Sequence, residues 1–443
     1  MVFCAQIDAG VMMHSEVQTG LFQVPATGGE PILITDPSES FSEPQFARTG
    51  GALYALRKRR ASDSTLTQLA RFAWPKPGKA MIVTASWDRL VAGFSISADG
   101  GTAYLDALDD GFARVFRVPT AGGAVEALLP TGRGAYRTVT PVAGGLTAIF
   151  ERAIQAPEIV RLEGDAHVPL TRFNAERVDA IDAPDPVHFW FTSAAGHRIH
   201  NMLVLPPGFD PKKKYPLVAL IHGGPATAYT DAFNYGAFWF HMHLLATPGY
   251  VVVATNYRGS LGLGEDFAEL VEKDVLRGPA LDILAGIDEA IRLHPFIDKD
   301  RLAAVGGSYG GYLINWLNGT SRRFKCLVSH VGPINNEAQY GTNDGGLERE
   351  VRMGVPIWEK GGQWNDQSPI RYAQNFSTPT LITHGERDFR VPLGEGLTNF
   401  KILQRLKVPS RFVVFPDEGH FVGRAENTRV FWREVKAWLA KYL

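Results

Sequence analysis

The stretch Gly306–Tyr312, which reads Gly-Gly-Ser-Tyr-Gly-Gly-Tyr, constrains the fold more than any other part of the chain. It follows Leu302–Val305, a short apolar run of strand length, and it precedes Leu313–Leu317, which reads as the first turns of a helix. A serine between glycines at a strand-to-helix turn matches the pattern Gly-x-Ser-x-Gly, in which a strained turn lifts the serine oxygen above the end of a sheet. A Gly-rich turn with an ordinary surface serine fits the same residues, so the flanking sequence has to decide.

From Leu217 onward, short apolar runs alternate with stretches of helical periodicity, such as the spacing of Ile283, Ile287 and Ala290. Strands buried on both faces that alternate with amphipathic helices predict a mostly parallel, doubly wound α/β sheet. The expected strands are His188–Thr192, Met202–Leu205, Leu217–Ile221, Val251–Thr255, Leu302–Val305, Cys326–Val328, Thr380–Thr383 and Arg411–Phe415, and the expected helices are Phe240–Ala246, Ala280–His294, Tyr309–Leu317, Leu393–Arg405 and Thr428–Tyr442.

From Gly20 to about residue 185 the sequence is all-β in style and contains a weak internal repeat. Strand-like copies begin at residues 21, 66, 115 and 159, and Gly-Gly turns recur in step at residues 50, 100 and 144. A period in the mid-forties with several short strands per repeat is typical of β-propeller blades, and a β-sandwich is the alternative. We predict an incomplete, propeller-like domain of about four blades over residues 1–185. A linker at Ala183–Pro186 joins it to an α/β-hydrolase domain over residues 186–443.

Two residues beyond the Gly306–Tyr312 turn, the nucleophile elbow, could activate the serine. A serine alcohol needs a base within hydrogen-bond reach and a third group that orients this base. Asp388 lies just past one predicted strand, and His420 lies just past the next. The chain order Ser308, Asp388, His420, with each residue after a strand, is the order of an α/β-hydrolase triad. The three residues therefore predict a nucleophile, its orienting carboxylate and its base.

Three other carboxylates lie near these residues in sequence and compete for the orienting role. Asp417 and Glu418 are too close to His420 to be favoured. Glu386 follows the same predicted strand as Asp388 and remains an alternative to it. The role falls to the carboxylate whose oxygen reaches the imidazole.

The tetrahedral intermediate of acyl transfer needs two preorganised N–H donors for its oxyanion. One donor is expected to be the backbone N–H of Tyr309, the residue after the serine. The other is expected from the loop Ile221–Pro225, whose glycines can turn their amides toward a substrate. An ordinary turn would explain this loop by itself. Together with the serine, the carboxylate and the histidine, all at strand ends, it predicts a serine hydrolase that needs no cofactor.

Several motifs within residues 187–443 resemble the prolyl oligopeptidase family of serine peptidases. They are Val218–Pro225, Asn256–Ser260 with Gly262, Gly264, Asp266 and Phe267, the Gly306–Tyr312 elbow, Gly385, Asp388, Arg390–Pro392 and Phe415–His420. The similarity is to the acylaminoacyl-peptidase and dipeptidyl-peptidase branch, and Trp358–Gly362 adds a weaker similarity to bacterial and fungal dipeptidyl-peptidases. The resemblance implies an N-terminal β-propeller that covers the active site and admits only short peptides.

The resemblance also implies roles for individual residues. Gly224 and Tyr309 match the oxyanion donors of the family, and the Tyr309 ring is expected to line the first specificity pocket. Arg390 matches a position that holds a substrate carbonyl in relatives, which a guanidinium can do through several donors; a surface salt bridge is the alternative. The implied enzyme releases N-terminal dipeptides or N-acylated amino acids from short peptides. A carboxylesterase on the same triad, or a truncated inactive remnant, is the alternative.

Composition limits the partners. The formal net charge of −1 gives no electrostatic footprint for nucleic acid and no polybasic membrane anchor. The two cysteines, Cys4 and Cys326, exclude a disulfide scaffold and favour a reducing compartment. The chain has no apolar run of about 18 residues, and Met1–Gly20 lacks the pattern of a signal peptide. We therefore predict a cytoplasmic protein, provided that the N-terminus is intact. No cluster has zinc spacing, and the exposed edge of an incomplete ring would favour homo-oligomers.

Overall fold

The computed structural model describes residues 1–8, 10, 18–60, 62–129, 133–181, 183–233, 240–345 and 348–443. Part of the N-terminal segment on which the absence of a signal peptide was argued therefore lies outside the described residues. The chain divides into two compact units. Unit 1 comprises Met1–Ala180, Thr230–Phe233 and Leu261–Glu269, and unit 2 comprises Ile181–Tyr229, Asn234–Ser260 and Leu270–Leu443. The predicted domain boundary between residues 185 and 186 stays a prediction.

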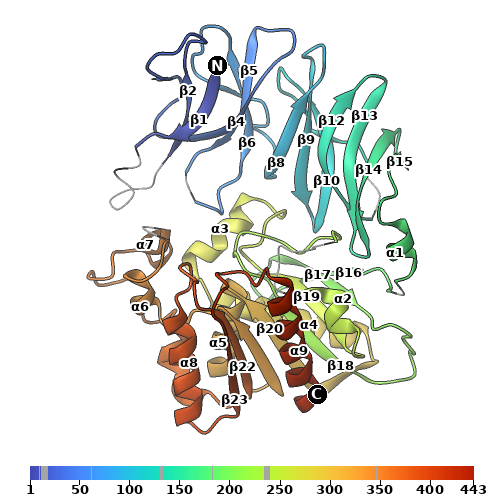
Figure 1. Cartoon of the computed structure of the whole chain (residues 1–443), viewed down its shortest axis with the longest axis vertical. Coiled ribbons are helices and arrows are strands. Elements are labelled where there is room, and N and C mark those ends of the chain that lie inside the picture. The colour runs from blue at the N-terminus through green and yellow to red at the C-terminus, as the bar shows by residue number, and fades with distance from the viewer. Residues whose placement is uncertain are drawn as a thin grey trace. The chain divides into compact units, whose positions relative to one another are not determined.

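Unit 1 contains antiparallel sheets of three or four strands, each a meander of strands that are consecutive in the chain (Figure 1). This architecture confirms the predicted propeller-like fold. The sheets are β1-β2-β3 (Val2–Gln6, Thr19–Gln23, Ile32–Leu33), β4-β5-β6-β7 (Ser40–Phe46, Ala52–Lys58, Gln68–Ala73, Met81–Ile82), β8-β9-β10-β11 (Val91–Ile96, Thr102–Asp109, Phe112–Pro119, Glu126–Ala127) and β12-β13-β14-β15 (Ala135–Val142, Gly145–Arg152, Gln155–Glu163, Ala166–Pro169). The short helix α1 (Ala175–Asp179) follows.

The sequence repeat falls on equivalent strands of these sheets. The copies that begin at residues 66, 115 and 159 overlap β6, β10 and β14, the third strand of each four-stranded sheet. The Gly-Gly turns at residues 50, 100 and 144 join the first strand of the same sheets to the second. Gly50 and Gly51 have φ of 71° and 73°, which is the left-handed conformation that glycine adopts without steric cost. The repeat is therefore a repeat of blade geometry.

Neighbouring sheets of unit 1 bury their apolar faces against one another. Each of its hydrophobic clusters draws residues from two successive sheets, as expected of blades that cannot bury both faces alone. Leu21 and Phe41 belong to one of these clusters, Tyr54 and Leu105 to the second, and Val115 and Phe150 to the third.

Unit 2 is built on one sheet of eight strands in the order β16-β17-β19-β18-β20-β21-β22-β23. Strand β17 is antiparallel to both of its neighbours, and the strands from β18 and β19 to β23 pair in parallel. The predicted mostly parallel sheet is thereby confirmed. The strands are β16 Val187–Thr192, β17 Arg198–Val204, β18 Tyr215–Ile221, β19 Val251–Asn256, β20 Ile297–Gly307, β21 Cys326–His330, β22 Thr380–Gly385 and β23 Ser410–Phe415.

Helices cover both faces of this sheet because alternate strand residues point to opposite sides (Figure 1). Leu217 of β18 packs with α4 and α5, whereas Val218 packs with α2 and α9. Ile382 of β22 packs with α8, on the face of α4 and α5. The helices are α2 Met242–Ala246, α3 Glu265–Lys273, α4 Arg277–Leu293, α5 Tyr309–Thr320, α6 Asn336–Tyr340, α7 Glu348–Met353, α8 Leu393–Arg405 and α9 Ala425–Tyr442, with a 3₁₀ helix at Pro369–Asn375.

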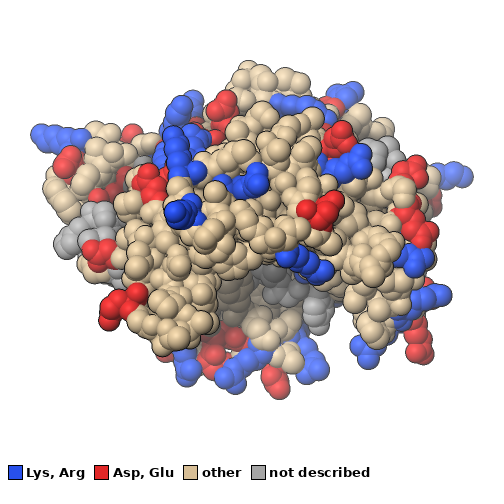
Figure 2. All heavy atoms as spheres, turned by 90° about the horizontal axis from the view of Figure 1, so that it is seen from above, with Lys and Arg blue, Asp and Glu red and all other residues tan. Residues whose placement is uncertain are grey.

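The face of the molecule in Figure 2 carries Lys and Arg side chains interspersed with Asp and Glu, as the near-zero net charge leads one to expect. Among the described helices, none combines the length and the hydropathy that crossing a bilayer requires.

Candidate active site

Ser308 occupies a strained turn between β20 and α5. Its φ of 56° and ψ of −120° lie outside the regions that a residue with a side chain normally adopts, at a cost of about 1–3 kcal/mol. The Ser308 N–H donates to the carbonyl of His330 over 3.0 Å. A Cβ at Gly306 would lie 2.6 Å from the Gly310 carbonyl, and a Cβ at Gly310 would collide with the carbonyl of Ile221. The elbow therefore has the tight strand-to-helix geometry that the sequence pattern predicts.

Ser308, His420 and Asp388 form a continuous chain of hydrogen bonds. The Ser308 Oγ lies 2.9 Å from His420 Nε2, and His420 Nδ1 lies 2.7 Å from Asp388 Oδ2. The other Asp388 oxygen accepts the backbone N–H groups of Arg390 and Val391 at 2.9 and 2.8 Å. The aspartate is buried, so its carboxylate is fixed in direction and shielded from water. This is the arrangement of a nucleophile, a base and a group that orients the base.

The competing carboxylates have other contacts. Glu418 is buried and accepts backbone N–H groups of the segment that enters α9. Asp417 accepts the Asn427 amide at 2.9 Å and pairs with Arg424 at 3.1 Å. Glu386 is exposed. Asp388 is thus the carboxylate that the structure brings to the imidazole.

The two residues that are predicted to donate to the oxyanion follow neighbouring strands, at one edge of the sheet. Ile221, at the end of β18, pairs with Gly306 of β20, so the loop with Gly224 and the turn with Tyr309 start side by side. Gly224 has a φ of 112°. Within the part of the chain that the structure describes, neither the Gly224 nor the Tyr309 backbone N–H has a hydrogen-bond partner. Their role as donors stays a prediction.

The Tyr309 ring lies in the core rather than on an open surface. It is flanked by Tyr257 and Tyr312, each with its ring centre 6.0 Å away, and its hydroxyl donates to the Val275 carbonyl. Burial raises the pKa of Tyr309 well above its usual value. Because only 5% of the residue is exposed, little of the ring is left for the predicted specificity pocket. This role also stays a prediction.

Arg390 carries the ion pair that was the alternative to a substrate role. Its Nε lies 2.8 Å from Asp344 Oδ1, and both side chains are about half exposed. An exposed pair of this kind contributes about 0–1 kcal/mol, so a substrate carbonyl can exchange with the aspartate at little cost. The predicted contact of Arg390 with a substrate carbonyl stays a prediction.

Two buried histidines beside the triad had no role in the sequence prediction. His384 Nε2 lies 2.7 Å from the Val391 carbonyl and 3.8 Å from Asp388 Oδ2, and His330 Nδ1 lies 2.8 Å from Thr383 Oγ1. Burial lowers the pKa of both imidazoles, so both are neutral at pH 7. Neither histidine therefore carries a positive charge that would compete with His420 for the Asp388 carboxylate. Their position at the ends of β21 and β22 was the available sequence signal.

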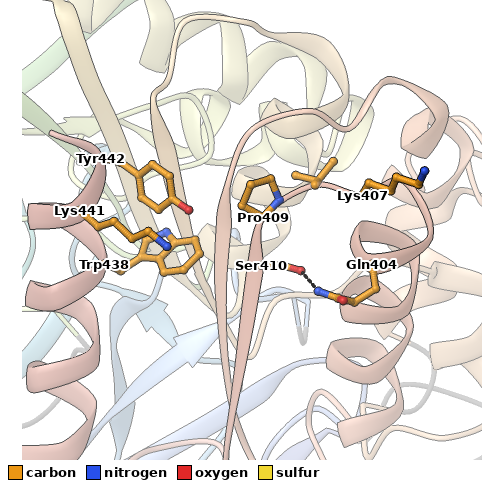
Figure 3. Close-up of a pocket in the computed structure, with 8 residues that line it drawn as sticks. Gln404, Lys407, Pro409, Ser410, Trp438, Lys441 and Tyr442 are labelled. Carbon is orange, nitrogen blue, oxygen red and sulfur yellow. Dashed lines mark hydrogen bonds between the residues drawn. The ribbon is translucent and has the colours of Figure 1, made fainter.

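A cavity of about 400 Å³ lies elsewhere in unit 2, where β23 begins and where α8 and α9 end (Figure 3). Ser410 is the first residue of β23, whereas the candidate triad follows strand ends, so the cavity is at the opposite edge of the sheet. None of the predicted site residues lines it. Its lining residues are Gln404, Lys407, Val408, Pro409, Ser410, Trp438, Lys441 and Tyr442.

Comparison with known proteins agrees with this geometry. Residues 237–443 match the model of the prolyl oligopeptidase family. A probable dipeptidyl-peptidase 5 of Aspergillus clavatus is 32% identical over 389 residues, which make up 81% of this chain and 50% of that protein. Dipeptidyl-peptidase 5 of Porphyromonas gingivalis is 35% identical over 259 residues, or 57% of this chain and 37% of that protein.

The solved structure of Pyrococcus horikoshii acylaminoacyl peptidase has the same fold. It superposes with a TM-score of 0.83 at 24% identity and covers 99% of this chain and 70% of its own. The chain spans about half the length of the curated dipeptidyl-peptidases that it matches along most of its sequence. The family model and these relatives assign residues 237–443 to the prolyl oligopeptidase family, and the solved structure shows that the chain shares its fold.

Proposed function

We propose that this chain is a serine peptidase that releases N-terminal dipeptides or N-acylated amino acids from short peptides. The observation that carries the proposal is the hydrogen-bonded chain from Ser308 Oγ through His420 to Asp388, with separations of 2.9 and 2.7 Å. Relatives named dipeptidyl-peptidase and a structural neighbour named acylaminoacyl peptidase support a peptide substrate.

In the proposed mechanism, His420 Nε2 takes the proton of Ser308 as Oγ attacks the scissile carbonyl carbon. Asp388 holds the proton on Nδ1 and stabilises the imidazolium that forms. The N–H groups of Gly224 and Tyr309 receive the oxyanion. His420 then gives its proton to the leaving amine, and a water molecule, activated by the same imidazole, hydrolyses the acyl-enzyme.

Arg390 is proposed to hold a carbonyl of the bound peptide. A guanidinium has several donors in a fixed plane, and an exposed partner such as Asp344 can be displaced without leaving a buried charge. Arg390 lies on the loop that carries Asp388, but its side chain takes no part in the proposed proton transfer. Loss of this contact would therefore weaken substrate binding.

A panel of matched chromogenic substrates tests the proposal: a free-amine dipeptide, an N-acetylated amino acid and a short-chain ester. We expect turnover of one peptide class by the wild type and none above background by Ser308→Ala with an unchanged melting temperature. Cleavage of the free-amine or the acetylated substrate chooses between the two peptidase types. Turnover of the ester alone would replace the peptidase by a carboxylesterase, and turnover by the Ser308→Ala variant would refute the mechanism.

A further inference from the structure

A buried polar network lies directly under the loop that carries Gly224. The imidazole of His222 stacks on Tyr257 with ring centres 4.2 Å apart and planes 17° from parallel. Its Nδ1 lies 2.8 Å from the Gly223 carbonyl, and its Nε2 lies 2.9 Å from Ser260 Oγ. The Tyr257 hydroxyl donates to the His222 carbonyl over 2.8 Å, and its oxygen lies 2.9 Å from His222 Nδ1. His222, Tyr257 and Ser260 are all buried from solvent.

These contacts assign the proton of the imidazole. The Gly223 carbonyl can only accept, and the Tyr257 hydroxyl gives its single proton to the His222 carbonyl, so both groups near Nδ1 are acceptors and require the proton on Nδ1. Nε2 is then an acceptor, which the Ser260 hydroxyl satisfies as donor. Burial lowers the pKa of His222 to about 4, so the ring is neutral at pH 7. The groups that face Nδ1 therefore select the tautomer in which Nδ1 donates to Gly223, and Ser260 stabilises this tautomer by donating to Nε2.

The geometry of one peptide unit links this network to the oxyanion. The Gly223 carbonyl and the Gly224 N–H belong to the same planar peptide bond, which is trans, so the two groups point in opposite directions. A hydrogen bond that fixes the Gly223 oxygen therefore also fixes the direction of the Gly224 N–H. At Gly224 the φ of 112° and the lack of a side chain would otherwise leave this peptide plane free to rotate.

We propose that His222, with its tautomer stabilised by Ser260 and its ring held by Tyr257, is a positioning residue for the oxyanion hole. It holds the Gly223–Gly224 peptide so that the Gly224 N–H meets the charge that develops on the substrate carbonyl oxygen. The inference rests on the proposed function and deepens it, because it identifies what preorganises one of the two donors.

The test uses the ester of whichever acyl group the peptide panel shows to be accepted, and compares it with its thiono analogue, in which sulfur replaces the carbonyl oxygen. Sulfur is a weaker hydrogen-bond acceptor than oxygen, so the oxo-to-thiono ratio of kcat reports how strongly the oxyanion hole stabilises the oxyanion. The variants Ser260→Ala and Tyr257→Phe are expected to lower kcat for the oxo ester about tenfold to a hundredfold, below the full loss of one donor. The oxo-to-thiono ratio should fall by a similar factor, with KM nearly unchanged. Ser260→Thr keeps the hydroxyl and should therefore retain the wild-type kcat and the wild-type ratio.

Tyr215→Phe is the matched control. Tyr215 begins β18, the strand that ends before His222, and its buried hydroxyl accepts the Asp210 N–H over 2.8 Å. This variant removes a comparable hydroxyl at the far end of the strand and should leave the ratio unchanged. If Ser260→Ala and Tyr257→Phe keep the wild-type ratio, or lose both activities equally, the positioning role is refuted. A wild type that cleaves neither peptide class refutes the proposed function itself, and this inference with it.

Discussion

Gly310→Ala is expected to destabilise the protein although alanine favours helices. Gly310 is the second residue of α5, where an alanine would ordinarily stabilise by up to about 1 kcal/mol. Here the added Cβ would lie 2.8 Å from the His222 carbonyl, against 3.4 Å or more for an ordinary contact, and closer still to that of Ile221. Overpacking of this kind costs about 1–3 kcal/mol, so we expect a net loss of about 1–2 kcal/mol.

The same displacement should slow the chemistry. The two carbonyls that must retreat belong to the end of β18 and to the loop that carries Gly224. A shift of about 1 Å in a catalytic group costs about a hundredfold in rate, so labelling by a fluorophosphonate probe should slow by up to that factor. Urea unfolding and the labelling rate are measured on the same preparations.

Gly394→Ala provides the control, because Gly394 is likewise the second residue of its helix, α8, and its Cβ would meet nothing within 4 Å. We expect it to be as stable as the wild type or more stable by up to about 1 kcal/mol, with unchanged labelling. The steric reasoning is wrong if the two variants behave alike.

Three further predictions concern the site. Asp388→Asn should lower kcat by about 10⁴ in the peptide assay, because an amide no longer holds the required tautomer of His420. Arg390→Ala should raise KM about tenfold, with kcat and urea midpoint nearly unchanged, because its ion pair is exposed; a lowered kcat alone would contradict the binding role. Burial lowers the pKa of His222 to about 4 in the native protein, whereas its ordinary value is about 6.5. Between these two pH values, the imidazole takes up a proton only when the protein unfolds. Its contribution therefore lowers stability by up to about 3 kcal/mol as pH falls through this window, and His222→Asn should flatten the urea-derived profile.

The α/β sheet was predictable because its strands are apolar on both faces. Every residue of β18 is buried, so a continuous apolar run marks the strand. The bounds predicted for α8, Leu393–Arg405, agree with the structure, since Pro392 directly precedes the helix. The strand ends in turn placed Ser308, Asp388 and His420 at one edge of the sheet.

Contacts between residues far apart in sequence were not predictable. Asp231 accepts the Gly134 N–H over 2.8 Å, and Glu265 accepts the N–H of Leu66 over 3.0 Å. Such contacts place Thr230–Phe233 and Leu261–Glu269 in unit 1, although both segments lie between strands of the α/β sheet in sequence. Neither segment has a local sequence pattern that shows this.

The network under the oxyanion loop was hidden for the same reason. The motifs around His222 and Tyr257 were both recognised, but the stacking of the two rings depends on β18 and β19 lying side by side. Only the pairing register brings the residues after these strands together.

Ser308 is assigned above as the nucleophile of an assembled triad. The most direct test is to treat the wild-type chain with a fluorophosphonate probe, digest it and locate the adduct by tandem mass spectrometry. We expect a single adduct on Ser308, none in Ser308→Ala, and slower labelling in Asp388→Asn. An adduct on another residue, or a folded wild-type chain that is not labelled, would refute the assignment of Ser308 as the nucleophile.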